Sequence, residues 1–250
     1  MAAPRAPSLA LLERLRSRWW ALVLPLSIVV VISGVALESA SARLLTYLAL
    51  ISVPPLAAAA LAWLVRGGRP PLALGVVPLF ALAWATEGSL SGETAALALS
   101  ALACVSLGWL VACVVPPRWL KLGIYAMAAI DAYLVGTNLL QEPNAVLNAA
   151  APAADLPRLQ LASFGSALMG FGDLFIAATL GALLASDRRL QLQGAALAAV
   201  ICTAFDLLFF FVDQTPATVP IALTLASLEL WKGANPESQE RSGRRPLPRT

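Results

Sequence analysis

Three aspartates interrupt long apolar segments of this 250-residue chain: Asp131, Asp173 and Asp206. A carboxylate within a membrane-spanning segment costs at least about 2.5 kcal/mol, so each of these residues is a candidate for function. The simpler interpretation is an acid that bonds to a neighbouring helix or reaches the interface. Asp131 and Asp173 lie on sequential segments, near the expected midplane, whereas Asp206 lies close to the end of its segment. The positions favour Asp131 and Asp173 as a pair.

Two carboxyl groups that meet in a medium of low dielectric constant share a proton, because both cannot ionise easily. The charged member activates a water molecule, the neutral member protonates a carbonyl oxygen, and the roles reverse as the tetrahedral intermediate collapses. This aspartic-protease chemistry needs no metal or other cofactor. The chain contains no histidine, which excludes Ser-His and Cys-His catalysis and histidine metal ligands. Its three cysteines lack CxxC spacing and are expected to be buried thiols: Cys104, Cys113 and Cys202.

Two glycines, Gly170 and Gly172, stand beside Asp173. They remove side-chain bulk next to the acid, so that a substrate backbone can come close, and they weaken a helix locally. Small residues at such spacing are also common where membrane helices pack closely. On its own, the glycine pair favours close packing.

The elements that must position these acids are apolar helices. The chain is 59% hydrophobic and 12% charged, about half the charge of a soluble domain, which predicts an all-α polytopic membrane protein. Its high Ala, Pro, Arg and Leu content is typical of a GC-rich bacterial genome, and a protein of the bacterial inner membrane is expected. Pro54 and Pro55 are expected to kink the second helix. Eight transmembrane helices are expected, at 19–37, 44–65, 71–86, 94–115, 119–140, 160–185, 191–212 and 215–231.

The basic residues predict the orientation. Of 17 Lys and Arg residues, 15 lie in the two tails and in alternate connections, so the positive-inside rule places both termini of a multi-pass protein in the cytoplasm of the cell. Residues 19–37 resemble a signal peptide, but the run exceeds the about 7–15 residues of a signal h-region and is expected to be a first helix. Residues 1–18 are expected to form a basic cytoplasmic tail, and residues 232–250 a disordered basic tail.

The stretch Gly170-Phe171-Gly172-Asp173 resembles the GxGD motif of the intramembrane aspartyl proteases, the family of presenilin and signal peptide peptidase. In that family the other catalytic Asp lies on the preceding helix after a tyrosine. Asp131 occupies this place, with Ile130 in place of the tyrosine. The family's Pro-Ala-Leu motif opens a helix two further along, where this chain has Pro216-Ala217-Thr218 and Pro220-Ile221-Ala222-Leu223. The resemblance covers residues 119–231.

The resemblance implies a presenilin-like catalytic four-helix part at 119–231, preceded by an N-terminal four-helix part at 19–115. Asp131 and Asp173 would be the catalytic residues. The substrate would be a single-span transmembrane helix in membrane lipid, such as a signal peptide remnant, with no metal, other cofactor or nucleic acid involved. The predicted orientation resembles that of signal peptide peptidase. The residues expected to bind substrate are Gly170, Phe171, Gly172, Pro216, Ala217, Pro220, Ala222 and Leu223.

Two other classes of function remain open. A proton- or cation-coupled membrane transporter would use the same buried Asp residues to bind or carry ions. A structural or regulatory membrane anchor would tolerate neutral replacement of both. Prepilin peptidases also carry a GxGD motif, but a lysine usually follows the Asp by one residue, and Leu174-Phe175 follows here.

Overall fold

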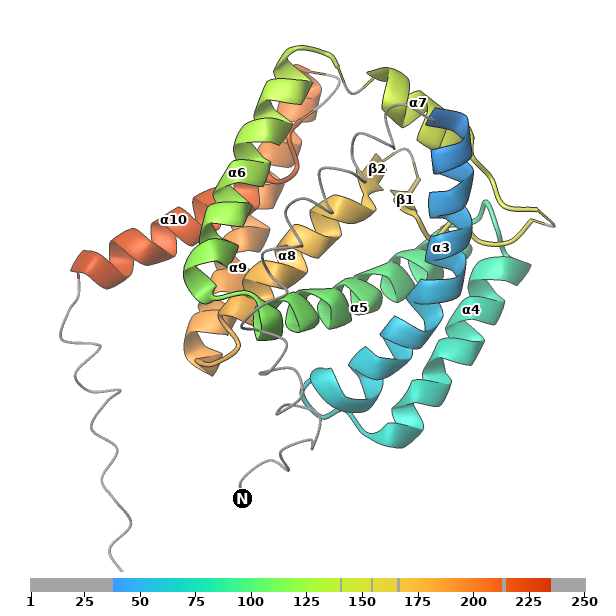
Figure 1. The fold of residues 1–250 in the computed structure, drawn as a ribbon, viewed down its shortest axis with the longest axis horizontal. Helices are drawn as coiled ribbons and strands as arrows, with labels where there is room; N and C mark the ends of the chain where they lie inside the picture. The colour runs from blue at the N-terminus through green and yellow to red at the C-terminus, as the bar shows by residue number, and fades with distance from the viewer. Residues whose placement is uncertain (1–37, 140, 154, 166, 213–214, 235–250) are drawn as a thin grey trace, which may run out of the picture.

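The structure is a computed structural model that describes residues 38–139, 141–153, 155–165, 167–212 and 215–234. The described part is mostly helical (Figure 1). The predicted first helix at 19–37 and the tail at 1–18 lie outside the described residues. The elements in chain order are α3 (Glu38–Ala59), the π-helix η1 (Ala60–Leu64), the 3-10 helix η2 (Pro70–Gly75), α4 (Val76–Ala85), α5 (Leu90–Val114), α6 (Pro117–Gly136), α7 (Gln141–Ala149), β1 (Leu161–Phe164), β2 (Ala167–Gly170), α8 (Phe171–Leu183), α9 (Arg188–Asp206), the 3-10 helix η3 (Leu207–Phe210) and α10 (Val219–Ala234).

Three helical segments are long and apolar enough to cross a membrane: Ala42–Leu64, Leu90–Val114 and Pro117–Gly136. Two shorter apolar segments, Pro70–Ala85 and Phe171–Leu183, accompany them. Large apolar side chains also lie on the surface, such as Phe210 and Phe211, which are 82% and 84% exposed. These features are those of a helical membrane protein, whereas the eight-span count remains a prediction.

The predicted helix at 160–185 is wrong in its first part. Residues 161–164 and 167–170 pair as two antiparallel strands instead, in which Leu161 pairs with Gly170 and Phe164 with Ala167. The hairpin turns at Gly165, whose φ of 61° lies in the left-handed region that glycine adopts without strain. The Gly165 N–H also donates to the Glu93 carboxylate at 2.7 Å, which ties the turn to α5.

Two further boundaries differ from the prediction. The loop between the two Asp-bearing helices contains the short helix α7, which the sequence did not predict. Helix α10 continues through Ala234, so residues 232–234 are helical rather than part of a disordered tail.

The two prolines of α3 are followed by a bend. Pro54 and Pro55 lie inside α3 and leave carbonyls of the preceding turn without their helical N–H partners. The chain bends beyond them and closes with the π-helical turn η1 (Figure 1), as the sequence predicts for this helix. Just beyond the prolines, the Leu56 carbonyl accepts a hydrogen bond from the Ser106 hydroxyl at 2.6 Å, which ties α3 to α5.

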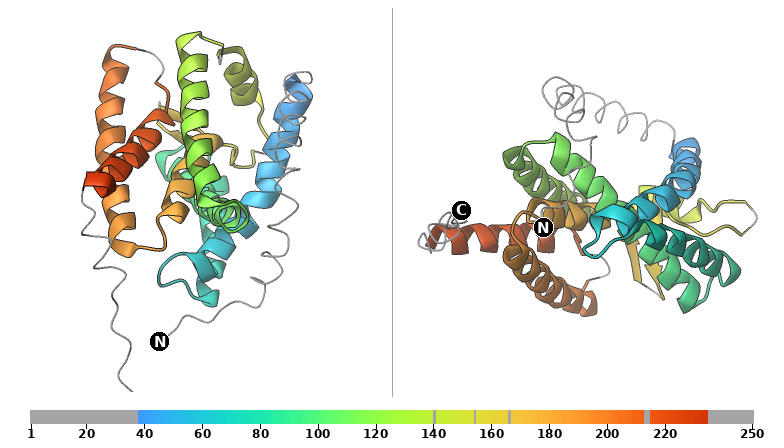
Figure 2. Two further views of the ribbon diagram at one scale, coloured as in Figure 1. Left: turned by 60° about the vertical axis from the view of Figure 1, so that its left-hand side comes forward. Right: turned by 90° about the horizontal axis from the view of Figure 1, so that it is seen from below.

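The apolar side chains form two cores, with α8 between them. The first core joins α3, α4 and α5 to Leu159, and the second joins α6, α8, α9 and α10. Helices α9 and α10 lie on the opposite side of the molecule from α3 (Figure 2). Helix α8 also packs on α5 at Gly108, where an added Cβ would lie 2.8 Å from backbone atoms of Ala178 and Thr179. Close approach through a small residue is typical of membrane helix pairs.

Candidate active site

The structure brings the two predicted catalytic aspartates close together. Asp131 lies on α6 and Asp173 on α8, and these two helices are in contact. Both residues are half-buried, and Asp131 lies near enough for its charge to act on Asp173. The chain therefore places two carboxyl groups in one electrostatic environment, as a shared-proton pair requires.

The two acids lie nearer the helix ends than the sequence predicted. Helix α6 ends at Gly136, five residues beyond Asp131, and Asp173 is the third residue of α8. Measured from the helix ends that the basic residues predict to be cytoplasmic, Asp131 lies about 20 Å along α6 from Arg118, and Asp173 lies about 15 Å along α8 from Leu183. The expected position deep within a long helix is wrong for Asp173, but the two residues still lie near enough for their charges to interact.

Asp173 is held by the hairpin that precedes it. Gly170 ends β2 and is the N-cap residue of α8, and its N–H donates to Asp173 Oδ2 at 3.1 Å. This is the returning bond of a capping box. An acid in the first helical turn is also favoured by the helix dipole. Asp173 is thereby fixed in orientation at the junction of strand and helix.

The two motif glycines have different surroundings. A Cβ at Gly170 would lie 3.3 Å from Asp173 Oδ2, so this position is tight against the acid. A Cβ at Gly172 would meet nothing within 4 Å, and Gly172 is exposed. Open space therefore lies beside Asp173 on the Gly172 side, where an approaching backbone would fit.

Asp131 is bound by the segment that resembles the Pro-Ala-Leu motif. Thr218, the residue before α10, donates to Asp131 Oδ2 from both its backbone N–H (3.1 Å) and its hydroxyl (2.7 Å). Thr218 is only 2% exposed. Thr218 is not among the residues expected to bind substrate, although it belongs to the Pro216-Ala217-Thr218 stretch that resembles the Pro-Ala-Leu motif. Its two donors reach Asp131, 87 residues earlier, through the packing of α10 on α6.

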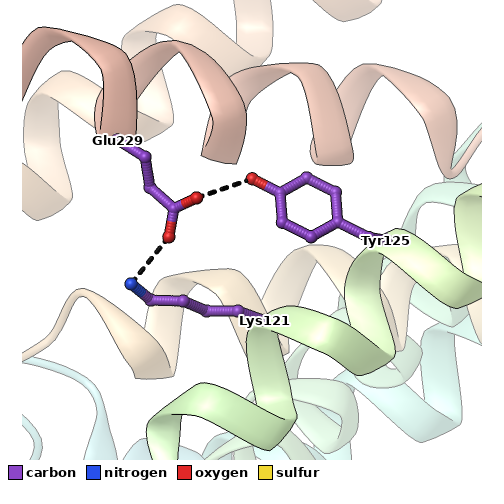
Figure 3. A network of polar contacts seen from close by, with 3 residues as sticks. All are labelled: Lys121, Tyr125 and Glu229. Atoms are coloured by element: carbon purple, nitrogen blue, oxygen red, sulfur yellow. Dashed lines mark hydrogen bonds and ion pairs between the residues drawn. The ribbon is translucent and has the colours of Figure 1, made fainter.

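A second polar contact joins α6 to α10 (Figure 3). The Glu229 carboxylate accepts a hydrogen bond from the Tyr125 hydroxyl at 2.8 Å and pairs with Lys121 at 2.6 Å. Sequence reasoning missed this group. The available signals were Glu229 as the sole acid of the 215–231 segment and the four-residue spacing of Lys121 and Tyr125, which places both on one face of α6. Helix α10 is therefore held to α6 at two levels, one of them at Asp131.

The remaining predicted site residues lie in different environments. The Phe171 side chain packs against the first core, and Ala222 is part of the second core. Leu223 is 44% exposed, and Asp206 is exposed at the end of α9. Pro220 is buried in the first turn of α10, where its missing N–H leaves no helical bond broken. The half-buried residues are Pro216 and Ala217.

The thiols take no part in a metal site among the described residues. All three cysteines are free, and Cys104 is buried with its Sγ 3.7 Å from the Phe171 carbonyl. No group of three or more Cys, Asp or Glu side chains gathers in the part of the chain that the structure describes. The Cys104 contact adds to the packing of α5 against the start of α8.

No protein-family model matches this chain, and neither a curated protein nor a solved structure matches it. The resemblance in the GxGD stretch therefore rests on short sequence motifs.

Proposed function

We propose that this chain is an intramembrane aspartyl protease, with Asp131 and Asp173 as its catalytic pair. The observation that supports this most strongly is the nearness of two carboxyl groups on contacting helices, one of them next to open space at Gly172 among the described residues. A water molecule and a peptide carbonyl need open space beside the two acids. The activity belongs to the GxGD class that the motif resembles.

The hydrogen bonds assign a role to each acid. Asp131 accepts two hydrogen bonds from Thr218, whereas Asp173 accepts one from Gly170. Donors to a carboxylate favour its charged form, so Asp131 takes a proton from water while Asp173 holds the shared proton and donates it to the substrate carbonyl oxygen. The water oxygen bonds to the carbonyl carbon. When the C–N bond breaks, Asp131 returns its proton to the leaving nitrogen, and Asp173 regains one from the diol.

The hairpin offers a place for unwound substrate. In the described part of the chain the sheet has two strands, and β1 packs on α5. Strand β2 carries the exposed Leu168 and Met169 and leads directly into Gly170. An extended peptide that pairs with β2 would satisfy its backbone N–H and C=O groups away from water. Its scissile bond would then lie beside Asp173.

The test is a cleavage assay with purified protein in liposomes and a set of tagged single-span helices. Asp131→Asn and Asp173→Asn keep side-chain volume and remove the acid, and each is expected to abolish cleavage. Asp206→Asn is the matched control and is expected to cleave like the wild type. Cleavage that survives either pair substitution would refute the assignment. Gradient-driven proton or cation uptake that requires both acids, without cleavage, would instead identify a transporter.

A further inference from the structure

A hollow lies between α8, α9 and α10, one to two helical turns beyond Asp173. Its volume is about 440 Å³, within the roughly 300–1,000 Å³ range of small-molecule sites. Its walls are mostly apolar and are formed by residues such as Ala177, Leu180, Ala195, Ala198 and Ile221. A Cβ at Gly181, which also lines the hollow, would meet nothing within 4 Å. An apolar chain would fit against these walls.

Among the described residues that line the hollow, the charged side chains are all positive. They are Arg66 and Arg188, which line it together with Gln191, and no acid belongs to this described lining. Arg66 donates to the Gln191 side-chain oxygen at 2.9 Å, and Gln191 in turn donates to the Gly181 carbonyl at 2.9 Å. Among the described residues, neither arginine forms an ion pair. The nearby Asp187 carboxylate is occupied by backbone N–H groups at the start of α9.

We infer that this hollow binds an anionic phospholipid, with an acyl chain against the apolar walls and the phosphate between Arg66 and Arg188. The apolar walls match the acyl chain of such a lipid, and the two arginines match its phosphate. Guanidinium groups bind phosphate oxygens with charge-assisted hydrogen bonds, and basic pockets between membrane helices are typical lipid headgroup sites. The basic-residue distribution predicts that these arginines lie at the cytoplasmic side, where anionic headgroups are available. The inference does not depend on proteolytic activity.

The experiment is native mass spectrometry of the full chain in a neutral detergent. Phosphatidylglycerol and phosphatidylcholine with identical acyl chains are added in equal amounts, and thermal unfolding is followed in parallel. We expect retention of phosphatidylglycerol and an increase in the unfolding temperature, with at least tenfold lower occupancy in the double variant Arg66→Gln, Arg188→Gln. The double variant Arg118→Gln, Arg189→Gln is the control, because it also removes two positive charges and neither side chain is among the residues that line the hollow.

Gly181→Leu provides a second test if the arginine variant does not fold. It fills the hollow and keeps both arginines, so it is expected to lose the lipid while folding normally. Equal retention of the two lipids would overturn the inference, as would unchanged phosphatidylglycerol occupancy in both variants. Displacement of the lipid by millimolar inorganic phosphate would overturn it as well, since the site would then take a free anion. Displacement by a single-span peptide would identify the hollow as a peptide site.

Discussion

Replacing Thr218 by valine tests the contact that joins Asp131 to α10. The change removes the hydroxyl that donates to Asp131 Oδ2 at 2.7 Å and keeps the backbone N–H that donates to the same oxygen at 3.1 Å. A hydrogen bond to a charged group contributes about 1.5–3 kcal/mol. Because one donor remains, we expect the free energy of unfolding to fall by about 1.5 kcal/mol, at the lower end of that range. If the bond also orients the acid during catalysis, cleavage should fall about tenfold, since 1.4 kcal/mol corresponds to tenfold.

A double-mutant cycle isolates this bond. Unfolding of the wild type, Thr218→Val, Asp131→Ala and the double variant is measured in the same detergent. In the Asp131→Ala background the threonine hydroxyl has lost its acceptor. The loss in free energy of unfolding caused by Thr218→Val should therefore be about 1.5 kcal/mol smaller in that background than in the wild type. Thr218→Ser keeps the donor and is expected to stay near wild type in cleavage and stability. Additive losses in the cycle would refute the contact between Thr218 and Asp131.

Three further substitutions test the packing, the open space and the second α6–α10 contact. Gly108→Ala forces a Cβ against the α8 backbone, which cannot move aside by a rotamer change. Thermal unfolding should therefore show that the free energy of unfolding falls by about 1–3 kcal/mol. Gly123→Ala is the control and should show no such loss, because its Cβ meets nothing within 4 Å. Gly172→Ala should leave the unfolding temperature unchanged but lower cleavage at least tenfold, and full activity would mean that substrate does not use this space. Glu229→Gln should lower the free energy of unfolding by about 1 kcal/mol or less, and this effect should become smaller in high salt, because Lys121 and Glu229 are 41% and 37% exposed. A larger loss of stability that does not depend on salt would contradict a surface ion pair.

The long helices were predictable from the sequence, whereas the hairpin was not recognised. Helices α5 and α6 follow the apolar runs at 94–115 and 119–140 within a few residues, because an apolar run longer than about 17 residues has few alternatives to a helix. Residues 160–185 are also mostly apolar, and periodicity does not distinguish a buried strand from a helix in such a run. The signal that separates them is Gly165-Ser166, two residues of the type that joins hairpin strands.

The acids of the candidate site were predictable, but their partners were not. Asp131 and Asp173 are unusual because of their apolar surroundings, which the sequence displays directly. Thr218 is an ordinary polar residue near a helix start, and only the packing of α10 on α6 brings its two donors to Asp131. For the same reason, Lys121 was only one of the basic residues used for the orientation, and Glu229 had no assigned role. Partners from distant helices depend on the relative positions of those helices, which local patterns do not determine.

The position of Asp173 depends on both cores because α8 contributes to each side of the molecule. Ile176 and Leu180 of α8 are buried in the second core, while Phe171, at the start of the helix, packs against the first. Asp173 lies between these contacts, and Asp131 is fixed to the second side through Thr218. A shift of α5 against α8 would therefore move one acid relative to the other without touching either of them. The N-terminal helices, which carry no motif of their own, thus have a physical role in the candidate site: they determine where Asp173 stands with respect to Asp131.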